Sequence, residues 1–202
     1  MGVILRFLIV FALLLGLLVF GCASTSDAYA RQADEKYNRG DFRGALDDLN
    51  KAIELNQSNA SLYTGRANMK SILNDYTGAI EDYTRAMELN PNDALYYMRA
   101  NVKENVEDYQ GTIDDLTMAI KLIKLNANTT LDESNLYNNR AFAKSQLSDY
   151  HGAINDSTKA IELDPNNTSA YSIRAAAKLE IGDKEGAQAD WARVGELTRK
   201  AS

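Results

Sequence analysis

Few residues in this chain can carry chemistry. His151 is the only histidine and Cys22 the only cysteine among the 202 residues. A single histidine argues against most zinc sites and most histidine-based acid–base catalysis. A single cysteine excludes an intrachain disulfide and a thiolate metal cluster. We therefore expect no metal, no bound cofactor and no enzymatic role.

An arginine recurs four times in the frame Tyr-x-x-Arg-Ala, and an aspartate stands sixteen residues after each copy. The pairs are Arg66 with Asp82, Arg99 with Asp115, Arg140 with Asp156, and Arg174 with Asp190. A constant offset predicts a constant charge-assisted contact between two helices. Gln32 and Asp48 occupy the same positions once more, where the amide could donate instead. The alternative, a row of arginines that binds an anionic ligand, is disfavoured because each arginine has its own acid.

The elements that carry these residues repeat along the chain. The tyrosines that mark the repeats are separated by 34, 33, 41 and 34 residues: Tyr29, Tyr63, Tyr96, Tyr137 and Tyr171. Small residues follow each tyrosine at fixed distances, on one helical face where two helices can pack closely. A break in each unit carries an aspartate suited to cap a second helix: Asp41, Asp75, Asp108, Asp149 and Asp183. Each unit is therefore predicted to be helix, tight turn, helix.

The period of about 34 residues, the alanine positions and the segment "DYTGAIEDYTRAMELNPN" resemble tetratricopeptide repeats. The resemblance covers about residues 26 to 200. It implies an all-α fold, a right-handed α-solenoid of five helix-turn-helix repeats over residues 28–200. It also implies that the first helices line a concave face that holds peptide segments of other proteins.

Groove residues are expected one, five and eight places after each tyrosine, a stripe separate from the core. Those expected to bind a peptide are Thr64, Asn68, Tyr97, Asn101, Asn138 and Phe142. The rest of the stripe is Ala30, Asp34, Tyr37, Ser71, Glu104, Ser145, Ser172, Ala176 and Leu179. Thr64 and Ala94 stand where the family's carboxylate-binding members have lysines, so that activity is not expected. The alternative is that the stripe is merely a solvated polar surface.

The amino terminus has the features of an export signal. An apolar run of 14 residues, 7–20, follows Arg6, and "VFGC" resembles the lipobox of bacterial lipoproteins. The resemblance implies a signal peptide over residues 1–21, acylation of Cys22 and a lipidated tether over residues 22–27. Cleavage before Ser24 and an uncleaved anchor are the alternatives. Each places the repeats outside the cytoplasm, because Arg6 marks the inner side.

Two parts of the array depart from the repeat. The third unit is seven residues longer than the 34-residue period, which predicts a longer second helix before a polar loop. Thr130 and Glu133 would then form a capping box for the next helix. In the fifth unit, Trp191 and Val194 lie where a following helix would cover them, so homo-oligomers through this repeat are a possible outcome.

The charge of −6 at pH 7 leaves no basic stripe for nucleic acid. We therefore predict a non-catalytic scaffold at a bacterial envelope membrane, binding protein partners whose identity the sequence does not give. In a double-membrane bacterium the outer membrane is favoured. A self-associating structural envelope protein is the alternative.

Overall fold

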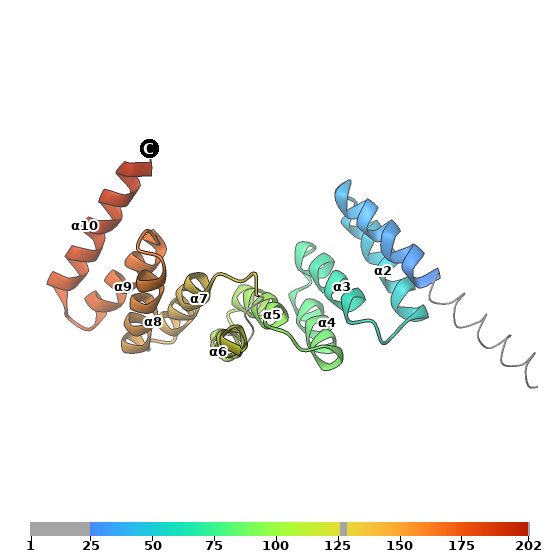
Figure 1. The fold of residues 1–202 in the computed structure, drawn as a ribbon, viewed down its shortest axis with the longest axis horizontal. Coiled ribbons are helices and arrows are strands. Elements are labelled where there is room, and N and C mark those ends of the chain that lie inside the picture. The colour runs from blue at the N-terminus through green and yellow to red at the C-terminus, as the bar shows by residue number, and fades with distance from the viewer. Residues whose placement is uncertain (1–24, 126–128, 202) are drawn as a thin grey trace, which may run out of the picture. The chain divides into compact units, whose positions relative to one another are not determined.

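The computed structural model describes residues 25–125 and 129–201, and the regular structure in these ranges is entirely α-helical (Figure 1). Chain contacts divide the protein into two compact units, Met1–Asn90 and Pro91–Ser202. None of the described helices is long and apolar enough to cross a membrane. The predicted signal, Cys22 and most of the tether lie outside the described residues.

The first unit contains two helix pairs joined by tight turns. A helix over residues 25–38 pairs with α2 (Phe42–Leu55). The second pair is α3 (Ala60–Ile72) with α4 (Tyr76–Leu89). These are the first two predicted repeats.

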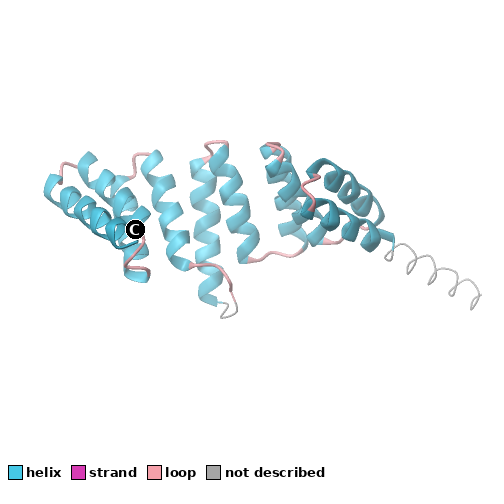
Figure 2. Cartoon of the chain, turned by 90° about the horizontal axis from the view of Figure 1, so that it is seen from above, coloured by secondary structure: helices cyan, strands magenta, loops and turns pink. Residues whose placement is uncertain are grey.

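The second unit contains three helix pairs, and Figure 2 draws its helices in cyan. They are α5 (Asp93–Asn105) with α6 (Tyr109–Leu125), α7 (Glu133–Gln146) with α8 (Tyr150–Leu163), and α9 (Thr168–Glu180) with α10 (Lys184–Ala201). The all-α fold with helix-turn-helix repeats is confirmed.

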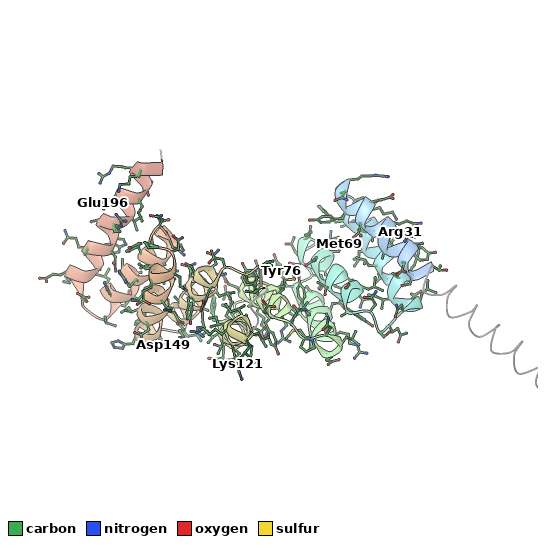
Figure 3. The ribbon with its side chains drawn as sticks, viewed as in Figure 1. Arg31, Met69, Tyr76, Lys121, Asp149 and Glu196 are labelled. Carbon is green, nitrogen blue, oxygen red and sulfur yellow. The ribbon has the colours of Figure 1, made fainter. Side chains whose placement is uncertain are left out.

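Each second helix begins at the predicted aspartate. Asp149, labelled in Figure 3, accepts a hydrogen bond from the backbone N–H of Gly152 at 3.0 Å. The same bond, at 2.9–3.0 Å, starts the other four second helices. A Cβ atom on Gly152 would lie 2.0 Å from Asp149 Oδ2, so the cap requires a glycine at this place. The motif Asp-x-x-Gly therefore fixes where the second helix starts.

The predicted small residues form the contact between helices. These fifteen positions lie 4, 16 and 23 residues after the five repeat tyrosines. Fourteen of them are buried, and the last, Val194, is partly exposed. In the second unit, Leu116 and Leu136 are 0% and 1% exposed and pack in one cluster with Ala100 and Ala119. Alanine at these positions lets the backbones approach, and the larger residues fill the space between pairs.

The third unit contains the predicted longer helix, because α6 has 17 residues where α2, α4 and α8 each have 14. The predicted capping box is wrong. The helix α7 begins at Glu133, and its N-cap is Asp132, whose carboxylate accepts from the backbone N–H of Ser134. Asp132 lies immediately before the helix, whereas Thr130 lies two residues too early.

Candidate functional site

All four predicted arginine–aspartate pairs are present. Arg66 Nε donates to Asp82 Oδ2 at 2.8 Å, and Arg66 Nη2 donates to Asp82 Oδ1 at 2.6 Å. The other three pairs have the same two bonds at 2.6–2.9 Å. Each aspartate is buried, at 3–5% exposure. Such bidentate pairs hold the two helices of a repeat at a fixed spacing and register.

Each aspartate also forms an ion pair with a lysine, a contact that was not predicted from the sequence. Lys70 Nζ lies 2.8 Å from Asp82 Oδ2, and Lys103, Lys144 and Lys178 make the equivalent contacts at 2.7–2.9 Å. In the first repeat, Lys36 pairs with Asp48 at 2.6 Å, whereas Gln32 is exposed. The amide expected there is therefore not the donor. The signal was a lysine seven residues after every repeated tyrosine.

The arginines also join one repeat to the next. Arg66 Nη1 donates to Asn50 of α2 at 2.9 Å, and Arg174 Nη1 donates to Thr158 of α8 at 3.1 Å. Arg140 makes the equivalent bond to Thr117 of α6. The acceptor stands two residues after the aspartate of the preceding repeat. Each of these arginines therefore connects three helices: its own, the second helix of its repeat and the second helix of the preceding repeat. Their hydrogen-bond donors are used to stabilise the stack of repeats and do not form a row that binds anions.

The tyrosine of the Tyr-x-x-Arg-Ala frame packs against the same arginine. The guanidinium carbon of Arg140 lies 5.2 Å from the ring centroid of Tyr137, and Arg174 lies 5.4 Å from Tyr171. These are cation–π distances. The repeated frame is therefore structural: an aromatic support, a bridging cation and a small residue at the helix contact.

A groove of about 650 Å³ lies in the first unit. We call it the α3 groove. It is lined by helix 25–38 (Ala30, Ala33, Asp34, Tyr37), α2 (Ala45, Leu49), α3 with its N-cap (Asn59, Ser61, Leu62, Gly65, Asn68, Met69, Ser71, Ile72) and α4 (Tyr83). Met69 is labelled in Figure 3. The predicted residue Asn68 lines this groove. Thr64 is not among the lining residues, and its hydroxyl donates to the carbonyl of Ala60.

Inside the α3 groove, the amide of Asn68 is oriented by Tyr83, whose hydroxyl donates to Asn68 Oδ1. Burial raises the pKa of Tyr83 to about 12, so the hydroxyl keeps its proton at neutral pH. With its oxygen engaged, Asn68 has its NH₂ group left to donate to a ligand carbonyl. Asp34 is the only charged residue in the lining of this groove.

A smaller cavity of about 270 Å³ lies in the second unit among α5, α7 and α9. We call it the α7 cavity. It is lined by Glu104, Asn138, Asn139, Phe142, Ser169 and Ile173. The predicted residues Asn138 and Phe142 meet there, whereas Tyr97 and Asn101 are not among its lining residues. Tyr97 packs against the core cluster instead.

Trp191 on α10 is exposed, at 46%. The equivalent residues of the four preceding repeats are buried: Leu49, Tyr83, Leu116 and Ser157, at 0–7%. The face of α10 that contains Trp191 is therefore uncovered in the described structure.

The comparisons with known proteins agree with the helix pairs. The tetratricopeptide repeat model matches residues 60–93, which contain α3 and α4, and residues 134–167, which contain α8 and all of α7 except Glu133. No curated protein matches the sequence significantly.

Among solved structures, MamA residues 41 to the end from Desulfovibrio magneticus superimpose with a TM-score of 0.79 at 18% identity, over 87% of this chain and 96% of that one. Another MamA structure gives 0.78 at 21% identity, over 87% and 93%. YrrB, a TPR protein with an unusual peptide-binding site, gives 0.73 at 20%, over 84% of both chains. The chain therefore contains tetratricopeptide repeats at residues 60–93 and 134–167 and shares the fold of these solved structures.

Proposed function

We propose that this protein is a non-catalytic scaffold that binds extended segments of partner proteins on its first helices and is held at a bacterial envelope membrane by a lipid on Cys22. The α3 groove carries the proposal. This groove is open, has a volume of about 650 Å³, and has Asn68, Tyr37 and Asp34 among its lining residues. That volume is within the range of about 300–1,000 Å³ typical of ligand sites.

The groove's chemistry suits a peptide backbone with apolar side chains. Asn68 supplies an amide donor, and Tyr37, Met69 and Ile72 supply apolar surface. Tyr37 and Ile72 are 47% and 42% exposed, so a bound segment would remove large apolar surface from water. The repeated arginines and lysines are paired with aspartates inside the repeats and do not line the groove. Asp34 is the charged residue of the lining, so the groove should favour partner segments that are neutral or basic.

Membrane attachment is the second part of the proposal, and the "VFGC" segment supports it. Acylation of Cys22 would leave only residues 22–24 before the helix over residues 25–38. An outer-membrane location is favoured in a double-membrane bacterium, with the repeats facing away from the cytoplasm.

Photo-crosslinking in cells tests the binding role. A benzoylphenylalanine replaces Tyr37 in the α3 groove or, as the control, the exposed Lys121 of α6 (Figure 3). The expected result is an adduct with a different protein from position 37 and none from position 121. Equal adducts from both positions, or none from position 37, would contradict a binding groove.

Self-association is the second candidate, and the exposed Trp191 favours it. An aromatic side chain whose four equivalents are buried offers apolar surface to a second copy. Trp191→Ala should then shift the purified chain from oligomer to monomer in light scattering. A chain that is already monomeric at cellular concentration would rule this candidate out.

A further inference from the structure

The α7 cavity differs in size from the α3 groove. Its volume is about 270 Å³, below the range of about 300–1,000 Å³ that whole cofactors and drug-sized ligands occupy. It is therefore suited to one side chain. Its three walls come from the first helices of three consecutive repeats, α5, α7 and α9, within one compact unit.

Asn138 lines this cavity with a hydrogen-bond acceptor that is not used. Its Nδ2 donates to Asn139 Oδ1 at 3.3 Å, whereas its buried Oδ1 accepts no hydrogen bond from the residues that the structure describes. Buried polar atoms without a partner are uncommon, because the lost hydration is not replaced. A ligand in the cavity whose hydrogen-bond donor reached this buried oxygen would supply the missing partner.

Glu104, on α5, adds a negative charge to the lining of the same cavity. The side chain is half-buried, and in the described part of the chain it forms no ion pair. Burial raises the pKa of Glu104 above its usual value, because the carboxylate loses hydration without gaining a cation. A cation in the cavity would restore that missing interaction.

The basic residues of the surrounding helices are engaged elsewhere. They form ion pairs with the buried aspartates: Arg99 and Lys103 with Asp115, Arg140 and Lys144 with Asp156, and Arg174 and Lys178 with Asp190. None of these basic residues lines the α7 cavity. The cation that would complement Glu104 is therefore expected to come from a ligand.

Two apolar side chains of the lining, one from α7 and one from α9, suit an aliphatic chain that ends in a cation. They are Phe142 and Ile173, and the ring of Phe142 is held by an edge contact with Tyr109, with centroids 6.4 Å apart and planes at 76°. Methylene groups pack against such surfaces, and an ammonium group is attracted to an aromatic face.

We propose that the α7 cavity binds a lysine side chain of a partner protein segment, with Glu104 and Asn138 Oδ1 accepting from its ammonium group. An ammonium is a compact charge with three donors, which suits a cavity of this size better than a planar guanidinium does. This inference rests on the proposed function and adds the side-chain chemistry of the segment.

The test titrates the full chain, in mild detergent, with Nα-acetyl-lysine N-methylamide and follows the side-chain amide NMR signals of Asn138. The uncharged matched probe is Nα-acetyl-norleucine N-methylamide. We expect saturable binding of the lysine probe and at least tenfold weaker binding of the norleucine probe. Glu104→Gln should weaken the lysine probe at least tenfold, whereas Glu107→Gln, on an exposed residue outside the cavity lining, should leave it unchanged.

Equal binding of the two probes, or undiminished binding to a folded Glu104→Gln chain, would overturn the assignment. A third probe, butylamine, separates a protein segment from a free amine. If butylamine binds as tightly as the lysine probe, the proposal that the ligand is a lysine of a protein segment is overturned. The crosslink from position 37 reports on the first unit, so a partner captured there without lysine selectivity at the α7 cavity would reject this inference and leave the proposed function standing.

Discussion

Arg140 of α7 and Asp156 of α8 are joined by two parallel hydrogen bonds, Nε to Oδ2 at 2.8 Å and Nη2 to Oδ1 at 2.7 Å. Lys144 adds a second cation 2.7 Å from Asp156 Oδ2, and Arg140 Nη1 reaches Thr117 of α6. One buried carboxylate therefore fixes two helices of its own repeat, and the shared arginine adds a third. The aspartate, which has two cationic partners, should matter more to stability than either cation.

The first prediction compares these side chains by substitution. Asp156→Ala leaves two largely buried cations without their acid and should lower the free energy of unfolding by about 3 kcal/mol. Arg140→Leu leaves Asp156 with Lys144 and should cost about 1–3 kcal/mol. Glu162→Ala breaks only an exposed pair with Lys159 and should change stability by less than about 0.5 kcal/mol. Urea unfolding followed by circular dichroism measures all three, and equal costs for Asp156→Ala and Glu162→Ala would refute the ranking.

The second prediction concerns acid stability of the fifth repeat. Burial would raise the pKa of Asp190, but hydrogen bonds from Arg174 and Lys178 outweigh it and hold the pKa below its usual value. A carboxyl group of this kind contributes stability above its unfolded pKa of about 3.9 and loses it as the pH falls through its folded pKa. Unfolding followed by Trp191 fluorescence should show stability falling below about pH 4.

Asp190→Asn provides the control for that titration. The variant should be less stable at pH 7, with a shallower loss of stability below about pH 4, because one titrating group is removed. If the free energy of unfolding falls equally steeply below about pH 4 in the variant and in the unaltered chain, Asp190 contributes nothing to the acid sensitivity.

The third prediction couples Asp149 and Gly152 at the start of α8. Asp149→Ala removes the N-cap and should cost about 1 kcal/mol. Gly152→Ala should destabilise the unaltered chain, because the new Cβ would meet Asp149 Oδ2. Without that carboxylate, the same alanine should be neutral or stabilise α8, since alanine is favoured over glycine in a helix by about 1 kcal/mol. A double-mutant cycle by thermal unfolding measures the coupling, and strict additivity would exclude it.

The sequence predicted the features that repeat, because a constant contact requires a constant spacing. The five aspartate caps and the four arginine–aspartate pairs followed from such spacings. The lysine that pairs with Asp48 recurs at the same spacing in every repeat. The arginine position of the first repeat holds Gln32, so Gln32 was predicted to be the partner of Asp48. Its actual partner, Lys36, lies one helical turn further along and reaches the same carboxylate.

The groove residues were harder to predict, because equivalent positions have different neighbours. Asn68 and Asn101 occupy matching places, but Asn68 accepts from Tyr83, whereas Leu116 stands in the corresponding place opposite Asn101. Tyr97 packs against the core of the second unit. Whether a residue of the stripe lines a groove depends on the distance between neighbouring helices. That distance is set by side chains in other repeats, so it does not follow from the position of the residue in its own repeat.

The fourth prediction concerns the amino terminus. If Cys22 is acylated, Cys22→Ser should leave the precursor uncleaved or release the chain from membranes, and Ser24→Ala should do neither. Membrane fractionation, with mass spectrometry of the amino-terminal peptide, distinguishes these results. A free amino terminus at Ser24 in the native protein would exclude the lipid anchor.

The last prediction separates binding from stability on the first helices. In the α3 groove, Asn68→Ala removes the amide donor and Tyr37→Ala removes exposed aromatic surface. With a partner recovered by crosslinking, each should weaken binding by about 1–3 kcal/mol, or roughly five- to a hundred-and-fifty-fold. Tyr97→Ala should instead lower the stability of the second unit, because Tyr97 packs against its core. Titration calorimetry and urea unfolding on the same variants measure both quantities. If Trp191→Ala abolishes binding while Asn68→Ala and Tyr37→Ala bind normally, the exposed face of α10, and not the α3 groove, is the binding surface.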